Sequence, residues 1–160
     1  MKIKLRQEEL LCSNCGKPRT FYYLSDYSYG ERLVLINHGT GYAYMNMIED
    51  AVYDDFSVLL KCILDERSIV FTHPDFAEVL NLLFGIACDN IGGVPIDFLY
   101  SMEKCLSCGS VKFDSELVGA EKIAEVDLPV ITHESWNLLN DEEKRNAVND
   151  LLDKFKSARN

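Results

Sequence analysis

Two cysteine pairs of identical spacing constrain the fold of this chain more than any other feature of its sequence. The segment C-S-N-C-G-K covers residues 12–17, and C-L-S-C-G-S covers residues 105–110. In each, a tight turn brings two thiols within reach of one ion, and the glycine that follows tolerates the positive φ that such a turn requires. Four thiolates complete the tetrahedral shell of a structural Zn²⁺. We therefore predict a zinc site with the ligands Cys12, Cys15, Cys105 and Cys108.

Two other uses of a C-x-x-C pair fit the sequence less well. A thioredoxin-like redox pair normally opens a helix, whereas residues 19–24 and 111–113, which follow the two pairs, are rich in β-favouring side chains. Structural disulfides are typical of exported proteins, and the first ten residues lack the continuous apolar run of a secretory signal. The apolar runs are also too short to span a membrane. We therefore expect a cytoplasmic protein with reduced thiols.

The two segments resemble the paired knuckles of zinc-ribbon proteins. The resemblance is confined to these segments, and the 89 residues between Cys15 and Cys105 exceed the usual spacing of a ribbon. It implies a ribbon that is split by an insertion, in which the ion joins a strand near the N-terminus to one in the C-terminal third. Because the metal closes a long loop, its contribution to folding is expected to be large, on the order of 10 kcal/mol.

Hydrophobic periodicity predicts strands beside both knuckles and helices between them. The expected strands cover residues 3–11, 19–25, 32–37, 95–104, 111–118 and 120–128. Apolar residues recur at helical spacing from Met45 to Ile63, although residues 42–44 can instead extend a strand. A second helix is expected from Pro74 to about Cys88. A C-terminal helix should begin after Asn140, where Asn140 and Glu143 form a capping box.

These elements predict an α+β protein with a split zinc-ribbon β layer, an inserted helical pair and a C-terminal helix. We treat residues 1–160 as a single domain, which is an ordinary length for one hydrophobic core. Residues 1–39 and 94–128 would form the β-rich zinc-ribbon part, residues 40–93 the helical insertion and residues 129–160 the C-terminal helical segment. The remaining cysteines lie in apolar helical contexts and are interpreted as small buried side chains: Cys62 and Cys88.

No motif in the sequence indicates catalysis. The three histidines, His38, His73 and His133, lie outside any metalloenzyme spacing, and we interpret them as residues of turns and of a helix entrance. A nucleophile elbow, a phosphate-binding loop and a dinucleotide fingerprint are all missing from the sequence. A zinc ion with four thiolate ligands leaves no position for a reactive water. We therefore expect a protein that is not an enzyme.

The formal net charge of −10 is uneven, with −8 contributed by residues 40–104. Such a field repels nucleic-acid phosphates and attracts basic surfaces, although acidity can also serve solubility alone. In size and charge the chain resembles bacterial toxin-immunity proteins. The resemblance implies a basic protein partner, such as a toxin nuclease, which the chain binds and neutralises. The candidate contacts are acidic residues and aromatic anchors: Asp50, Asp54, Asp65, Tyr42, Tyr44 and Tyr53.

Two other functions stay open at this stage. Zinc ribbons often serve as nucleic-acid or transcription accessory proteins, and a local basic patch is available from Lys2, Lys4, Arg6, Lys17 and Arg19. The net charge argues against that role. An enzyme whose site is assembled from distant residues is the third hypothesis, and a histidine with a perturbed pKa beside a carboxylate in a deep pocket would favour it.

Overall fold

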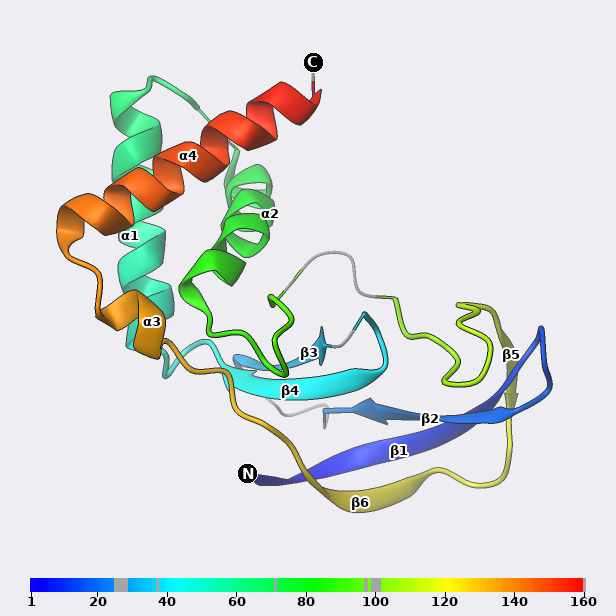
Figure 1. The fold of residues 1–160 in the computed structure, drawn as a ribbon. Coiled ribbons are helices and arrows are strands. Elements are labelled where there is room, and N and C mark those ends of the chain that lie inside the picture. Colours follow the sequence, from blue (N-terminus) through cyan, green and yellow to red (C-terminus); the bar gives the residue numbers. More distant parts are fainter. Residues whose placement is uncertain (25–28, 37, 71, 97, 99–101, 160) are drawn as a thin grey trace. The chain divides into compact units, whose positions relative to one another are not determined.

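The computed structural model describes residues 1–24, 29–36, 38–70, 72–96, 98 and 102–159, which form two compact units (Figure 1). The strand unit comprises Met1–Glu49 and Tyr100–Ile131, and the helical unit comprises Asp50–Leu99 and Thr132–Asn160. This division is based on the contacts within each unit and does not test whether the units fold together. That residues 1–160 act as a single domain therefore stays a prediction.

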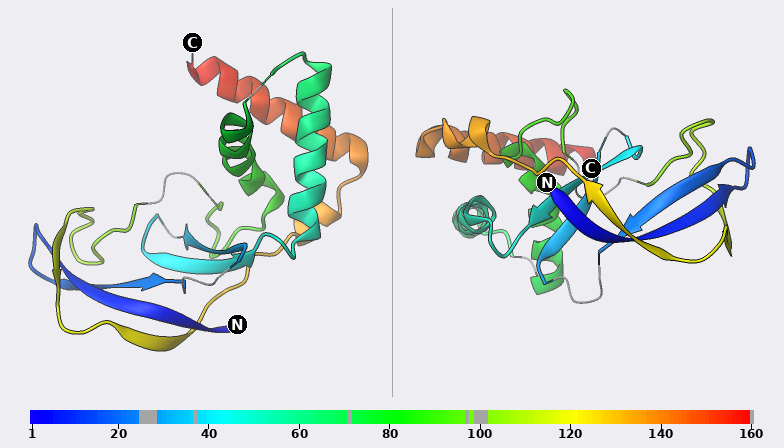
Figure 2. Two further views of the ribbon diagram at one scale, coloured as in Figure 1. Left: turned by 180° about the vertical axis from the view of Figure 1, so that it is seen from behind. Right: turned by 90° about the horizontal axis from the view of Figure 1, so that it is seen from below.

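A four-stranded antiparallel sheet forms the larger part of the strand unit. Its strands are β1 (Lys2–Cys12), β2 (Pro18–Tyr23), β5 (Phe113–Leu117) and β6 (Lys122–Asp127). The long strand β1 is central, with β2 on one edge and β6 beside its first half on the other edge, as the left view of Figure 2 shows. At the end of β1, Cys12 is opposite Phe113 of β5. This pairing brings the first knuckle next to the strand that follows the second knuckle.

A β-hairpin completes the strand unit, and its strands are β3 (Glu31–Ile36) and β4 (Gly41–Asn46). The backbone of Tyr44 in β4 bonds to the segment after β6, because its N–H donates to Pro129 at 2.9 Å and its carbonyl accepts from Ile131 at 3.0 Å. The two sheets share a small apolar core of Leu5, Tyr42, Tyr44 and Leu128.

The helical unit packs three long helices around an aromatic core. Its elements are α1 (Ala51–Glu66), α2 (His73–Phe84), the short 3₁₀ helix η1 (Gly85–Ala87), α3 (Glu134–Asn137) and α4 (Asp141–Arg159). Figure 1 shows α4 lying across α1 and α2. Phe56, Phe84 and Trp136 are each at most 4% exposed and meet ring to ring. Burial of such rings is the main source of stability in a unit of this size.

The helix starts follow the local sequence closely. The predicted capping box is confirmed, since Asn140 N–H donates to Glu143 Oε2 at 2.8 Å and Glu143 N–H donates to Asn140 Oδ1 at 3.0 Å. Helix α1 begins later than its apolar periodicity indicates. Asp50 is its N-cap and accepts from the Tyr53 N–H, while Met45 belongs to strand β4.

The α+β class is confirmed, with two sheets and four α-helices within the described residues and a C-terminal helix. The predicted strand over 95–104 has no counterpart among its described positions, and residues 97 and 99–101 lie outside the described ones. Residues 25 and 37, at the ends of two other predicted strands, also lie outside them. Among the helices described, none combines the length and the apolar character needed to cross a membrane.

Candidate metal centre

The first knuckle is a tight turn between β1 and β2. Its two closing hydrogen bonds run from Cys12 N–H to the Lys17 carbonyl at 2.9 Å and from Gly16 N–H to the Cys12 carbonyl at 2.7 Å. Gly16 has a φ of 68°, and open space surrounds the position of a Cβ there. The glycine is therefore required by backbone conformation and not by crowding.

The second knuckle repeats this geometry before β5. Cys105 N–H donates to the Ser110 carbonyl at 2.8 Å, Gly109 N–H donates to the Cys105 carbonyl at 2.9 Å, and the φ of Gly109 is 71°. The knuckles are joined directly, since Ser13 N–H donates to the Lys112 carbonyl at 3.0 Å. Two equivalent turns thus face one another across the end of β1.

The four knuckle cysteines meet, as the sequence predicted. Their Sγ atoms all lie within 4.8 Å of one another, with 3.6 Å between Cys12 and Cys108 and 3.5 Å between Cys15 and Cys105. A tetrahedron with metal–sulfur bonds of about 2.3 Å has edges of roughly 3.8 Å, which these separations approach. A disulfide needs a sulfur separation of about 2.05 Å, and all six cysteines are free thiols. The cluster therefore fits one tetrahedral metal ion.

Backbone and side-chain donors around the cluster lower the pKa of some of its thiols, whereas contacts among the thiols raise the pKa of Cys15. The Asn14 side chain and the Ser110 N–H lower the pKa of Cys108 to about 6, and N–H groups of Ser107 and Cys108 lower that of Cys105. The Lys17 N–H also favours the Cys15 thiolate, but desolvation and hydrogen bonds within the cluster outweigh it and raise the pKa of Cys15 to about 12. A divalent cation offsets this repulsion, so that binding would release protons.

Comparison of this chain with protein-family models, curated proteins and solved structures gives no match. The four-cysteine cluster is itself consistent with a zinc-ribbon-like site. Function is therefore inferred from the geometry and charge of this chain's own residues.

The acidic residues predicted to contact a partner do not share one environment. Asp54 and Asp65 are exposed on α1. The Asp50 side chain is only 14% exposed, because it caps α1 and bonds to His133. A residue that starts a helix places its carboxylate over the helix end and not on the outer face.

The predicted aromatic anchors are mostly internal. Tyr42 and Tyr44 are buried in the strand unit, where their hydroxyls donate to Glu103 at 2.6 Å and to Glu31 at 2.5 Å. Both side chains are engaged in that core and are not available on the surface. Tyr53 is half-buried in the helical unit and packs edge-to-face on Phe84, with 4.9 Å between the ring centroids.

Sequence reasoning missed a buried polar contact in the helical unit. His133, predicted to be a turn residue, is buried, with Nδ1 at 2.6 Å from the Ala87 carbonyl and Nε2 at 2.8 Å from Asp50 Oδ2. Both ring nitrogens therefore face oxygen atoms of neighbouring elements. The contacts join α1, η1 and α3. No local pattern links residues 50 and 133, so only the packing of the helices reveals the pair.

The other two cysteines differ from each other. Cys88 is buried as predicted, and burial raises the pKa of its thiol. Cys62 is exposed, so its predicted burial is wrong. It directly precedes the buried Ile63–Leu64 pair on α1 and faces away from that apolar stripe. An apolar sequence context does not establish which face of a helix a residue occupies.

Proposed function

We propose that this chain is a non-catalytic zinc-binding protein that binds and neutralises a basic protein partner, as an immunity protein does with a nuclease toxin. The observation that carries the proposal is that most of the negative charge belongs to the helical unit. The helical unit has 15 Asp/Glu and 7 Lys/Arg, a net charge of −8, whereas the strand unit has 11 and 9, a net charge of −2. An enzyme that binds nucleic acid needs a basic surface, to which an acidic unit is complementary.

Zinc is the metal that this ligand set favours. Four soft thiolates at tetrahedral separations suit Zn²⁺, and they fill its coordination shell. Cys12, Cys15, Cys105 and Cys108 would hold the ion, which would then be structural and tie the two knuckles together. Free thiols persist in a reducing compartment, so we place this function in the cytoplasm.

The exposed side of α1 is the proposed contact surface. Asp54, Asp55 and Asp65 are exposed there and lie on one helix. Charges at an exposed rim mainly accelerate association and depend strongly on salt. Asp50 is excluded from this surface by its role as an N-cap.

A nucleic-acid accessory role has weaker support. Of the basic residues that favoured it, Arg19 is only 6% exposed and donates to the Thr40 carbonyl at 3.2 Å. Lys2 lies 3.5 Å from Glu125, and Arg6 lies 3.7 Å from Glu121. Neighbouring carboxylates therefore offset much of the predicted basic patch, and phosphate binding needs cations that are not already paired.

The test is capture of the partner with the tagged, zinc-loaded chain from its source organism, followed by a nuclease assay. We expect a basic protein whose nuclease activity is abolished at equimolar chain. The association rate should fall at least tenfold between low salt and about 0.5 M salt, because screening removes electrostatic steering. An acidic partner, or a captured nuclease that keeps its activity in the complex, would overturn the proposal.

A further inference from the structure

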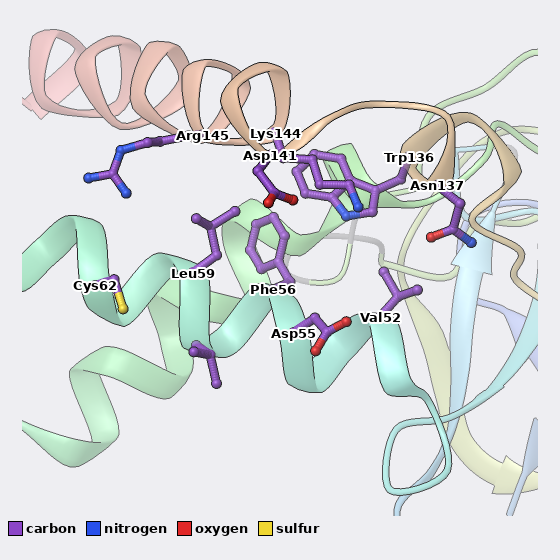
Figure 3. A pocket seen from close by; sticks show the side chains of 11 residues that line it. Val52, Asp55, Phe56, Leu59, Cys62, Trp136, Asn137, Asp141, Lys144 and Arg145 are labelled. Carbon is purple, nitrogen blue, oxygen red and sulfur yellow. The ribbon is translucent and has the colours of Figure 1, made fainter.

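The helical unit contains a groove between α1 and the first turns of α4, with a volume of about 360 Å³ (Figure 3). Its floor is aromatic, since Phe56 and Trp136 are buried with 5.5 Å between their ring centroids. Val52 and Leu59 of α1 add partly exposed apolar walls. A hollow of this size with an apolar floor is typical of sites that receive apolar side chains or small ligands.

The charges at the rim of the groove are unequally engaged. Lys144 lies over the Trp136 ring, 5.8 Å from its centroid, and Arg145 is paired with Glu66. Asp55 of α1 and Asp141 of α4 are exposed, and neither has an ion-pair partner within the part of the chain that the structure describes. One cation of the rim is therefore paired with a carboxylate and the other lies over an indole ring, while the two carboxylates are available for an added cation.

We propose that this groove receives a short amphipathic helix of the basic partner. An apolar side chain of that helix fills the space over Phe56 and Trp136, and a flanking Lys or Arg pairs with Asp55 and Asp141. Lining residues recur along α1 from Val52 to Cys62, a span of about 15 Å at the helical rise, which matches the anchors of a helix bound in a groove. The inference rests on the proposed function, whose contact surface includes Asp55.

A direct binding experiment is possible because Trp136 is the single tryptophan of the chain. The zinc-loaded full chain is titrated with a tryptophan-free synthetic helical peptide that carries leucine anchors at i, i+4 and i+7 and lysine flanks. Two matched peptides replace the lysines by glutamates or by serines. We expect saturable fluorescence changes with the lysine peptide. The glutamate and serine peptides should each bind at least about tenfold more weakly.

A charge reversal tests the role of the rim. Asp55→Lys should weaken binding of the lysine peptide about tenfold and strengthen binding of the glutamate peptide. The matched control is Asp150→Lys, which makes the same charge change at an exposed position of α4 outside the groove. It should leave both affinities within about twofold of the parent values, since screened charges beyond the Debye length contribute little.

Three outcomes would overturn the groove proposal. The first is equal affinity for the three peptides, which would mean that binding is apolar and indifferent to charge. The second is the absence of a fluorescence change with any peptide. The third is an equal effect of Asp55→Lys and Asp150→Lys. A captured basic nuclease that is still inhibited by Asp55→Lys with unchanged affinity would also overturn it, and the proposed function would stand. Failure to capture any basic partner, combined with charge-selective peptide binding, would overturn the proposed function and not the groove.

Discussion

The two units of this chain differ in how their stability is built. The strand unit joins two distant chain segments through β1 pairing, a small apolar core and four clustered thiols. The helical unit has five ring-to-ring contacts around Phe84 and Phe56, with helices that carry their own caps. We infer that the strand unit depends on a metal ion and the helical unit does not, because all four clustered thiols belong to the strand unit, where an ion would tie together two distant chain segments.

Removal of a metal ligand should have the largest effect, because it should destabilise the strand unit and leave the helical unit folded. Cys12→Ser eliminates a ligand that is 1% exposed, and we expect loss of zinc and unfolding of the strand unit, at a cost on the order of 10 kcal/mol. Amide NMR spectra resolve the two units, so the resonances of residues 50–96 should persist. The control is Cys62→Ser, at an exposed thiol outside the cluster. Full thermal stability of Cys12→Ser would contradict the structural role of the metal.

Loss of the contact between Asp50 and His133 should have the reverse effect, destabilising the helical unit and leaving the metal site intact. Asp50→Ala removes both the N-cap of α1 and the partner of His133, so we expect a loss of about 3 kcal/mol in the free energy of unfolding. Urea unfolding followed by Trp136 fluorescence measures it. Zinc content should stay at one ion per chain. The exposed neighbour substitution Asp54→Ala should change stability by less than about 0.5 kcal/mol, and an equal loss in both variants would refute the assigned role of Asp50.

Alkaline pH should act on the strand unit through Tyr44. Desolvation and the hydrogen bond to Glu31 raise its pKa to about 12 from the model-compound value of 10.0. Since the unfolded chain releases this proton first, the stabilising contribution is complete below pH 10 and is lost as the pH rises through 12. Stability curves over this range should be flatter for Tyr44→Phe than for the parent chain. Identical slopes would show that Tyr44 does not titrate as proposed.

A pair of glycine substitutions gives the smallest predicted effect. Gly16→Ala places a side chain at a φ of 68° with no steric contact, which costs about 1–2 kcal/mol and should weaken zinc affinity about tenfold. Gly93→Ala imposes the same strain in the helical unit, at a φ of 79° and also in open space. Its zinc affinity, measured by competition with a chelator, should equal that of the parent chain. A loss in both variants would mean that the units are coupled energetically.

Much of the metal centre was predictable because its chemistry is local. A C-x-x-C-G turn closes through hydrogen bonds within six residues, so each knuckle forms from its own sequence. The requirement of an ion for four thiolates then predicts that the knuckles meet. Cys62 and the tyrosines of β4 were misplaced, since burial depends on which face of an element meets the core.

The sequence by itself determined the α+β class, the capping box before α4, the two knuckles and the uneven charge, all of which depend on residues close together in the chain. Only the tertiary structure decided that Cys12 is opposite Phe113, that Asp50 contacts His133, and that a groove opens between α1 and α4. Such pairings join residues about 80 to 100 positions apart, where loop-closure entropy and packing select the partner and local propensity carries no information.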